Sequence, residues 1–382
     1  MVWIDGPGWV LVAPLAPLEP RGDWATTVRR SLDGSGWPVA TVACFTYEGG
    51  ALFEQMPAPL AESGLPPVWL GQIEAAFLWD HHGLRIQGRP GAVERLAALP
   101  PVSTPAPPAA TGRARRLTTP AQFRRGVRTI LDHLRSGDCY QVNLARELRV
   151  THAGDPLDAW RRLRRQNPAR RGFYLEMPHA TVVSNSPELL LEARRGRVRS
   201  APIKGTAPRL ADRDASRAEA LRLLQSPKER AELTMITDLV RSDLARVVLA
   251  DSLSATPRRV GAVGHVWHAI REVRGTLAPG RDALDAFGVL FPAGSVTGAP
   301  KVRAMELIRA LEPGPRGAYC GSIGWFGSDS SARFNVAIRT ITFRGGEASL
   351  HVGAGIVLGS DPEREYAETE LKAARMLESL CA

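Results

Sequence analysis

Three features of the sequence predict an α+β fold. Apolar residues recur at three- and four-residue spacing between Thr119 and Arg135, as on one face of a helix. Short apolar runs bounded by turn residues, such as 39–46 and 68–71, are typical of strands. Such segments follow one another without the regular alternation of a doubly wound parallel sheet, and 382 residues suffice for two or three average domains or one large core.

The first hundred residues alternate apolar runs with turn residues, which predicts strands at 39–46, 68–71 and 75–79. The segment Pro100–Gly112 then holds five prolines in thirteen residues, so it continues neither a helix nor a central strand. We interpret it as a linker or a long surface loop. It separates an N-terminal portion, 1–112, made mostly of strands, from a C-terminal portion, 113–382.

The C-terminal portion mixes helical and strand periods. Its first helix, 119–135, is followed by Gly137 as a stop signal, and a long helix, 227–248, begins at Ser226 and Pro227, which suit the N-cap and first-turn positions. The remaining predicted elements are helices at 301–311 and 363–380 and strands at 181–183, 188–192, 197–203, 321–326, 334–343 and 348–357.

Composition argues against several classes of protein. No apolar run reaches the roughly 18–20 residues that cross a bilayer, and residues 1–18 lack the basic segment that begins a signal peptide. The four cysteines are scattered without a CxxC spacing, which argues against a disulfide framework and against a zinc site. We therefore expect a cytoplasmic protein that makes no membrane contact.

The formal net charge of +10 invites a nucleic-acid-binding interpretation, but the nature of the basic residues argues against it. Only four of the 49 are lysines, and the arginines are spread along the chain. A solvated basic surface accounts for this charge, so we expect no nucleic-acid partner. The rare lysines are Lys204, Lys228, Lys301 and Lys372, and they are of interest because a lysine can lose its proton and act as a nucleophile, whereas an arginine cannot.

The segment 188–204 predicts a hairpin with its turn at 194–196. Antiparallel pairing about that turn places Glu188 opposite Lys204, with their Cβ atoms roughly 5 Å apart. Such a pair is either a surface ion pair or a general acid and base beside a lysine nucleophile, and the spacing alone leaves both interpretations open.

Four glutamates form a second set of candidate residues. Glu229 and Glu232 lie three residues apart on the helix 227–248, and Glu365 and Glu368 have the same spacing on the last helix. Carboxylates on two facing helices suit Mg²⁺, which takes few protein carboxylates and keeps several waters. Ion pairs on helix surfaces give the same spacing, and the spacing alone favours them.

Two glycine-rich stretches, 292–301 and 352–356, allow backbone amides to approach an anion, and the first opens a helix whose N-terminus favours negative charge. Neither has the spacing of a Walker or dinucleotide motif. Arg339, in the expected strand 334–343, has the chemistry for a bidentate contact with a carboxylate, although a single arginine in a strand is usually structural or exposed.

Taken in order, these pieces resemble the chorismate-utilising enzymes over about residues 119–380. The motifs that carry the resemblance are Gly137–Leu144 (GDCYQVNL), Ser186–Glu188 (SPE), Pro202–Thr206 (PIKGT), Glu232–Leu244, Trp267–His268, Gly298–Arg303 (GAPKVR), Tyr319–Gly324, Gly353–Gly355 (GAG) and Glu368–Lys372 (ETELK). The first hundred residues match weakly, chiefly at Phe45–Glu48. The resemblance implies a large α+β sandwich of two β-sheets flanked by helices, in which residues 1–112 pack against a chorismate-binding catalytic domain, 113–382.

The lysine of PIKGT is typical of the aminodeoxychorismate synthases, component I, within this family, whereas anthranilate synthases typically carry alanine there. The resemblance implies that Lys204 attacks C2 of chorismate and that Glu188 acts first as a general acid and then as a base. Ammonia would replace the 4-hydroxyl and give 4-amino-4-deoxychorismate, on the route to p-aminobenzoate and folate.

The matching motifs imply further site residues. Glu232 and Glu368 would hold Mg²⁺, with Glu229 and Glu365 as supports, and His268 would lie near the 4-hydroxyl of chorismate. The residues implied in binding the substrate are Ser295, Tyr319, Arg339, Gly353, Ala354 and Gly355.

The source of ammonia is constrained by the cysteines. Cys139 and Cys320 lie inside the synthase motifs, so no module with the activated cysteine of a glutaminase is recognisable. We therefore expect free ammonium, or a separate glutamine amidotransferase subunit, as the source. The alternatives left open are anthranilate synthase component I, a water-adding isochorismate or salicylate synthase, an arginine-rich nucleic-acid-binding protein, and a catalytically inactive family member.

Overall fold

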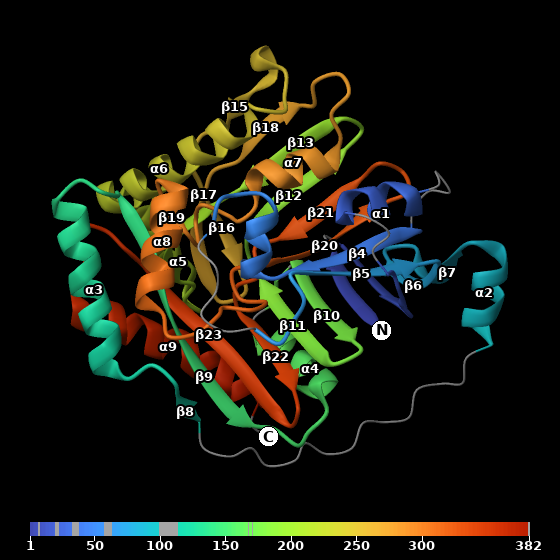
Figure 1. The fold of residues 1–382 in the computed structure, drawn as a ribbon, viewed down its shortest axis with the longest axis horizontal. Coiled ribbons are helices and arrows are strands. Elements are labelled where there is room, and N and C mark those ends of the chain that lie inside the picture. Colours follow the sequence, from blue (N-terminus) through green and yellow to red (C-terminus); the bar gives the residue numbers. More distant parts are fainter. Residues whose placement is uncertain are drawn as a thin grey trace.

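The computed structural model describes residues 1–6, 8–19, 23–32, 38–56, 63–98, 114–166, 168–169 and 171–380. Two large antiparallel β-sheets form the centre of the molecule, and helices surround them (Figure 1). Apolar residues of both sheets share one buried cluster, which includes Ile4, Val42 and Ile323. The predicted α+β sandwich is therefore confirmed.

The first sheet combines strands from both ends of the chain. Its strands pair in the order β19 (Gly298–Ala299), β9 (Gln141–Thr151), β23 (Glu347–Ile356), β22 (Thr340–Arg344), β11 (Ala180–Ser186), β10 (Arg171–Met177), β1 (Val2–Gly6), β2 (Trp9–Ala13), β6 (Ala75–Asp80) and β7 (Gly83–Gly88), and β8 (Arg115–Arg116) also pairs with β9. The β9–β23 ladder runs from Thr151↔Glu347 to Val142↔Ile356 and carries much of the site described below.

Two further sheets complete the β-structure of the described residues. The second large sheet has the order β15 (Ser254–Ala255), β18 (Val273–Thr276), β13 (Arg197–Ala201), β12 (Leu189–Arg194), β21 (Ala332–Asn335), β20 (Ser322–Gly327), β4 (Ala40–Phe45), β5 (Val68–Ile73) and β3 (Ala16–Pro17). A small third sheet has the order β14 (Ile203–Pro208), β17 (Val266–Ile270) and β16 (Arg259–Val263).

The helices lie around the sheets. They are α1 (Trp24–Ser31), α2 (Pro90–Ala97), α3 (Pro120–Arg135), α4 (Pro156–Gln166), α5 (Arg213–Gln225), α6 (Pro227–Leu244), α7 (Ala283–Leu290), α8 (Lys301–Leu311) and α9 (Pro362–Leu380), with short 3₁₀ turns at Tyr47–Leu52 and Ala250–Ser252. Helices α4 and α9 bury Trp160 and Met376 against one face of the first sheet. Helix α3 runs beside α9 and β9 (Figure 1).

The N-terminal strands pair directly with strands of the C-terminal portion. β1 pairs with β10 in the first sheet, and β4 pairs with β20 in the second. Both large sheets are thus built from the two portions together. The proline-rich segment 100–112 lies outside the described residues, and the boundary at residue 112 stays a prediction.

Many predicted elements coincide with observed ones, and α8 spans the predicted residues. The expected strand 334–343 is wrong. The chain leaves the second sheet after Asn335 and enters the first at Thr340, so the residues between them cross from one sheet to the other. Arg339 lies on this crossing with a φ of 52° and not within a strand. The sequence patterns predict no element at several other places, among them β9, α4, α5 and α7.

A buried arginine, Arg316, joins three segments of the chain. Its guanidinium donates to both carboxylate oxygens of Glu312, at 2.8 and 2.6 Å, and to the backbone carbonyls of Asn143 and Val296, at 2.6 and 2.9 Å. Glu48 accepts hydrogen bonds from the backbone N–H groups of Arg316 and of the following glycine, at 2.7 and 3.1 Å. The arginine therefore ties β9 and the 291–297 loop to the N-terminal portion.

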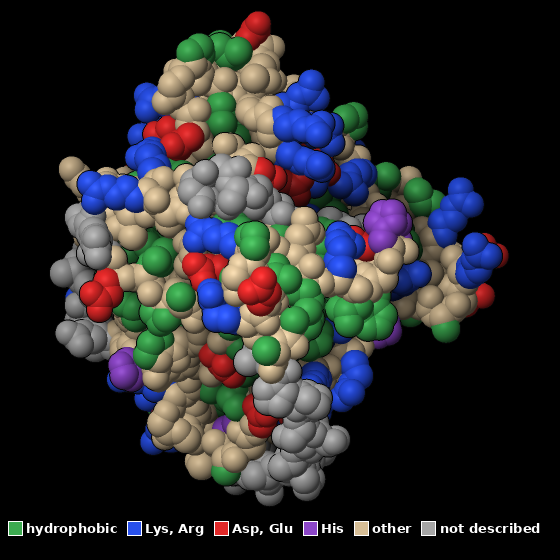
Figure 2. Space-filling model, turned by 90° about the vertical axis from the view of Figure 1, so that its right-hand side faces the viewer, with side chains coloured by type: hydrophobic (Ala, Val, Ile, Leu, Met, Phe, Trp, Pro, Cys, Tyr) green, Lys and Arg blue, Asp and Glu red, His purple; other side chains and the backbone are tan. Residues whose placement is uncertain are grey.

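Basic side chains on the surface are interspersed with acidic and apolar ones. Figure 2 shows lysines and arginines on one face in small groups, with acidic residues between them. Many of these cations are paired, and the buried Glu272 alone contacts Arg199, Arg259 and Arg274. Among the helices that the structure describes, none is both long enough and apolar enough to cross a bilayer.

Replacing Arg316 by methionine is predicted to lower the free energy of unfolding by about 3–5 kcal/mol, because it leaves the Glu312 carboxylate buried without its partner. Chemical denaturation of the purified variant measures this loss. Arg303→Met, which removes half-exposed ion pairs with Glu306 and Asp138, is the control and should cost no more than about 1 kcal/mol. Equal losses for the two variants would contradict the role assigned to Arg316.

Candidate active site

Lys204 lies on a strand that has left the predicted hairpin. β12 and β13 pair as far as Leu189↔Ala201, and Lys204 belongs to β14, where it is paired with Ala269 of β17. The expected pairing of Glu188 with Lys204 across a single hairpin is therefore wrong, because the chain passes from the second sheet into the third directly after Ala201.

A β-bulge at Gly205 sets the direction of Lys204. The register shifts between Lys204↔Ala269 and Thr206↔His268, and bulges of this kind re-aim neighbouring side chains. Gly205 has a φ of 69°, a left-handed value that glycine adopts without strain. A Cβ at this position would also stand 2.5 Å from a carboxylate oxygen of Glu229, so a larger residue would have to displace that side chain.

Glu188, which is buried, and Lys204, which is half-buried, nevertheless lie close enough for their charges to interact. Burial raises the pKa of Glu188 to about 7, although the Ser295 hydroxyl, the Lys204 charge and the N–H of Ile203 all act to lower it. Burial also lowers the pKa of Lys204, against the charges of Glu232 and Glu188. A carboxyl that keeps its proton near neutral pH beside an amine that loses its proton more readily provides a general acid and a nucleophile.

One edge of β23 is open at the site. β22 pairs with β23 only as far as Ile341↔Leu350, so along 351–356 the described strands adjoin β23 on its β9 side alone. On this stretch the carbonyl of Gly353 accepts a hydrogen bond from Lys372 Nζ at 2.8 Å. Among the described residues, this stretch of β23 therefore has no strand partner on the side where β22 diverges from it.

The two glycines of β23 make room for the catalytic side chains. A Cβ on Gly355 would stand 3.3 Å from Lys204 Nζ, and one on Gly353 would stand 2.8 Å from the Tyr319 hydroxyl. Because side chains alternate along a strand, these glycines share one face, and Ala354 between them is buried on the other. The backbone can thus approach a bound molecule closely on the side of Lys204.

His268 and Arg339 form a second contact within the site. His268 Nδ1 lies 3.1 Å from the carbonyl oxygen of Gly205, and Nε2 lies 3.4 Å from Arg339 Nη2. Burial and the Arg339 charge lower the pKa of His268 to about 4, so the ring is neutral at pH 7, with Nδ1 as donor and Nε2 as acceptor. Arg339 Nη1 has no hydrogen-bond partner among the described residues and is available to an anion.

The four predicted glutamates lie near one another at the starts of α6 and α9: Glu229, Glu232, Glu365 and Glu368. Burial raises the pKa of Glu232 and of Glu365, and repulsion from neighbouring carboxylates adds to this rise. Two lysines approach the group, with Lys228 Nζ 3.9 Å from Glu232 and Lys372 Nζ 2.7 Å from Glu368. The group therefore attracts cations.

This acidic group has the donor chemistry of a Mg²⁺ site. Among the described residues no set of three or more His, Cys, Asp or Glu side chains forms a ready-made metal cage. Mg²⁺ needs none, because it usually binds through one or two carboxylates and completes its shell with water and substrate oxygens. Glu232 and Glu368, presented by two different helices, suit such a site.

Two amides of β9, which the candidate list from the sequence omits, face the same place. Gln141 is fully buried, and neither its side-chain oxygen nor its nitrogen has a hydrogen-bond partner within the described part of the chain; the same holds for Asn143 Nδ2. The Gln141 amide nitrogen would lie 3.5 Å from a Cβ on Gly355. An unsatisfied buried polar group costs about 1–3 kcal/mol, so these amides are suited to bond a ligand. Their two-residue spacing within GDCYQVNL was the signal available in the sequence.

Lys301, another of the four lysines, has a structural role, because its amine joins several elements of the fold. Its Nζ lies 3.1 Å from an Asp243 oxygen and 3.6 Å from a Glu54 oxygen, and it donates to the carbonyl of Val289 at 3.4 Å. It fastens the start of α8 to α6, α7 and the N-terminal portion.

Comparison with known proteins gives a consistent picture. The model of the family described as chorismate binding enzyme matches residues 17–378. The chain is 37% identical to anthranilate synthase component 1 of Streptomyces coelicolor, covering 94% of this chain and 78% of that protein. It is also 37% identical to aminodeoxychorismate synthase component 1 of Klebsiella aerogenes, covering 88% and 76%. The crystal structure of anthranilate synthase component I from Streptococcus pneumoniae superimposes with a TM-score of 0.84, at 26% identity, over 97% of this chain and 92% of that one.

Glu188→Gln is predicted to change the pH dependence of stability. The native pKa of about 7 lies above the ordinary value of 4.5, so the native carboxyl retains a proton that the unfolded one releases. The wild-type free energy of unfolding should therefore fall, relative to the variant, as pH rises through this interval, by on the order of 3 kcal/mol. Denaturant titrations of both proteins between about pH 4 and pH 8 measure the difference. A difference that does not vary with pH would contradict the raised pKa.

Proposed function

The chain belongs to the family of chorismate-binding enzymes, and we propose that it is the synthase component that converts chorismate and ammonia into 4-amino-4-deoxychorismate. The observation that carries this proposal is the amine of the half-buried Lys204, which lies against Gly355 and interacts electrostatically with the carboxyl of the buried Glu188. The finer assignment follows from the lysine in the PIKGT motif, since related anthranilate synthases typically have an alanine at that position.

In the first half of the reaction, the neutral amine of Lys204 adds to C2 of the chorismate ring. The double bonds shift, the C4–O bond breaks, and Glu188 gives its proton to the departing hydroxyl, which leaves as water. Burial supports both roles, because it favours the uncharged form of each group.

In the second half, ammonia adds to C4 while the double bonds shift back and the bond between C2 and Lys204 breaks. The Glu188 carboxylate accepts a proton from the incoming nitrogen, so the catalyst regains its starting state. Chorismate and ammonia are consumed, and 4-amino-4-deoxychorismate and water are formed.

The surrounding groups are suited to hold the carboxylates of chorismate. Arg339 presents an unpartnered guanidinium nitrogen, and the backbone of β23 from Gly353 to Gly355 lies along the open edge of the strand. Tyr319 presents its hydroxyl over Gly353. The neutral ring of His268 orients Arg339 through Nε2.

Glu232 and Glu368 would hold Mg²⁺, supported by Glu229 and Glu365. When bound there, the ion supplies positive charge that offsets a substrate carboxylate among these glutamates. These glutamates lie close enough to Lys204 for their negative charges to raise the pKa of its amine. A cation held by them would therefore act on the same amine.

Ammonia would come from a separate glutamine amidotransferase subunit, or from free ammonium. The names of the relatives support this, since they are component 1 of their synthases. The described cysteines are all buried, and burial raises the pKa of Cys44 and of Cys320 to about 12. Neither thiol is thus suited to form the thiolate that a glutaminase needs.

Anthranilate synthase is the second candidate function, because relatives with that name match as well as those named aminodeoxychorismate synthase. It also uses ammonia but does not need Lys204 as a nucleophile. Water-adding enzymes need a base that activates water. The Gln141 amide that faces the glycines cannot be that base, and Glu188 is assigned here to the proton transfers of amination.

Lys204→Ala and Lys204→Arg are both predicted to lose amination, by at least about 100-fold in kcat. Arginine keeps the positive charge but cannot become a neutral nucleophile. Intact-protein mass spectrometry of wild type with chorismate and no ammonia should show an adduct of chorismate less one water, absent from both variants. Rescue of activity by arginine would show that the site requires charge rather than a nucleophile.

Removal of divalent metal by EDTA is predicted to abolish turnover, and added Mg²⁺ should restore it. Glu232→Gln and Glu368→Gln should each raise the Mg²⁺ concentration needed for half-maximal rate by about tenfold or more. Full turnover in metal-free buffer would contradict the assignment of these two glutamates.

A further inference from the structure

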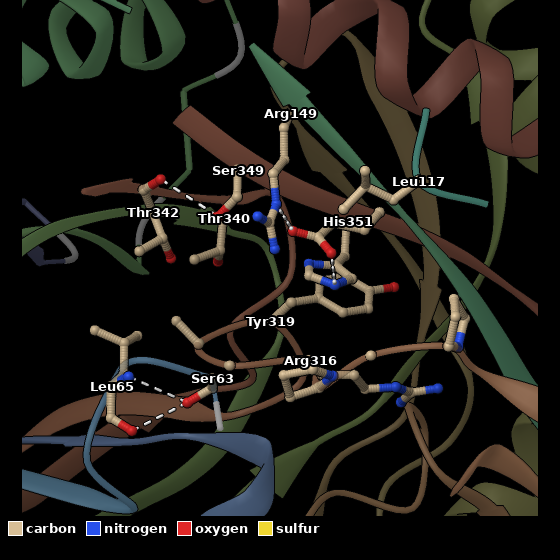
Figure 3. A pocket seen from close by; sticks show the side chains of 16 residues that line it. Ser63, Leu65, Leu117, Arg149, Arg316, Tyr319, Thr340, Thr342, Ser349 and His351 are labelled. Atoms are coloured by element: carbon tan, nitrogen blue, oxygen red, sulfur yellow. Dashed lines mark hydrogen bonds and ion pairs between the residues drawn. The ribbon is translucent and has the colours of Figure 1, made fainter. Parts of the chain in front are cut away.

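A cavity of about 300 Å³ lies against the first sheet, beside the point where β22 and β23 diverge. Figure 3 shows side chains of β9, β22 and β23 along one wall and the loop that holds Arg316 along another. The rings of Tyr319 and His351 both line it. A side chain that borders a void has no partner atoms on that side, so the place of the Tyr319 ring depends on its other contacts.

The backbone around Tyr319 gives its ring no sheet neighbours. Tyr319 lies in the turn 317–320, just before β20. Its N–H donates to the carbonyl of Arg316 at 3.2 Å, and the next residue, Cys320, has a left-handed φ of 61°. In a sheet, opposed side chains on the neighbouring strands restrict a ring. In this turn, contacts with other side chains must do so.

The hydroxyl of Tyr319 belongs to the candidate active site. It would stand 2.8 Å from a Cβ on Gly353, and Gly353 lies two residues from Gly355, whose Cβ would stand 3.3 Å from Lys204 Nζ. Burial raises the pKa of Tyr319 well above its ordinary value, so the hydroxyl keeps its proton at neutral pH and can donate to a carboxylate. The direction of the ring decides where this donor lies.

His351 is held in place by the sheet and by a hydrogen bond. It is the first residue of β23 beyond the pairing with β22, and it remains paired with Glu147 of β9. A ring N–H of His351 donates to the backbone carbonyl of Pro315. Burial lowers the pKa of this ring to about 3, so it is uncharged at neutral pH. The strand and the bond to Pro315 together fix the plane of the imidazole.

The fixed ring of His351 is stacked on the ring of Tyr319. Their centroids are 5.5 Å apart and their planes differ by 13° (Figure 3). Aromatic rings at this separation attract one another beyond the effect of buried area alone. Arg316 Cζ lies 5.9 Å from the centroid of the Tyr319 ring, and the ion pair with Glu312 fixes this arginine. Two immobile neighbours therefore hold a ring that the cavity leaves unsupported.

We propose that His351 is a positioning residue for the substrate: its ring holds the ring of Tyr319 so that the Tyr319 hydroxyl is directed at a carboxylate of chorismate. This role rests on the proposed function, in which Tyr319 helps to hold that carboxylate. Because the cavity borders the stack, the Tyr319 ring has room to turn away when the imidazole is removed. The loss of His351 should then weaken the binding of chorismate without altering the reacting groups.

Single variants test this role by comparing KM with kcat. His351→Gln removes the flat ring but keeps an amide that can bond the Pro315 carbonyl, and it should raise KM for chorismate about tenfold with kcat within about threefold of wild type. His351→Phe restores a flat ring and should bring KM back to within about threefold. Ser349→Ala, in the same cavity wall, is the control and should keep both values. A wild-type KM in His351→Gln, or equal losses in His351→Phe, overturns the proposal.

A double-mutant cycle with Tyr319→Phe separates positioning from general damage to the fold. This variant keeps the stacked ring but lacks the hydroxyl, so KM for chorismate should rise about tenfold. Adding His351→Gln should then raise KM by less than about twofold more, because the donor that the imidazole positions is already absent. Equal effects of His351→Gln in the two backgrounds would overturn the proposal.

The consumption of chorismate supplies every KM value, whatever the product. A wild type that forms anthranilate, with the expected pattern of KM values, refutes the proposed function alone. A wild type that forms 4-amino-4-deoxychorismate without this pattern overturns the role of His351 alone.

Discussion

The buried pair of Arg316 and Glu312 is the constraint on which the site depends. The arginine bonds the backbone of β9 at Asn143 and that of the 291–297 loop at Val296, while Glu312 accepts a hydrogen bond from the N–H of Ala145, at 2.8 Å. These contacts fix the strand that carries the unpartnered amides, the loop that carries Ser295, and the turn that leads to Tyr319. Because the pair is desolvated on all sides, neither member can be lost without leaving a buried charge. The N-terminal portion completes the same network through Glu48, and its strands pair into both large sheets.

A single physical cause, burial, prepares the two reacting groups. It raises the pKa of Glu188 and lowers the pKa of Lys204, so it favours an acid that is still protonated and an amine that is less so. The nearby glutamates raise the pKa of Lys204, and a cation bound among them would reduce that rise. The same burial keeps the ring of His268 neutral, and its Nε2 orients the guanidinium of Arg339. Local desolvation thus divides the roles between Glu188 and Lys204, which would otherwise both be ionised at neutral pH.

The sequence was sufficient for the fold class, for many of the helices, and for the residues that lie in contiguous motifs. Lys204, Glu188 and the glycines of β23 could be found because the spacing or the motif containing each is local. The register between Glu188 and Lys204 could not be predicted, because a change of sheet and a bulge at Gly205 lie between them. Gln141 was overlooked since its importance comes from burial against residues far away in the chain. The sequence predicts a strand at Arg339, because nothing in its neighbourhood signals that the chain crosses between sheets there.

The identity of the product tests the central claim most directly. Purified protein would be incubated with chorismate, Mg²⁺ and a high concentration of ammonium at alkaline pH, and the products separated by chromatography and identified by mass spectrometry. The account predicts 4-amino-4-deoxychorismate, which an added lyase converts to p-aminobenzoate. Anthranilate as the product would contradict it, because the amine would then have been added without the lysine chemistry assigned to Lys204. Isochorismate or salicylate would contradict it too, since water rather than ammonia would be the nucleophile.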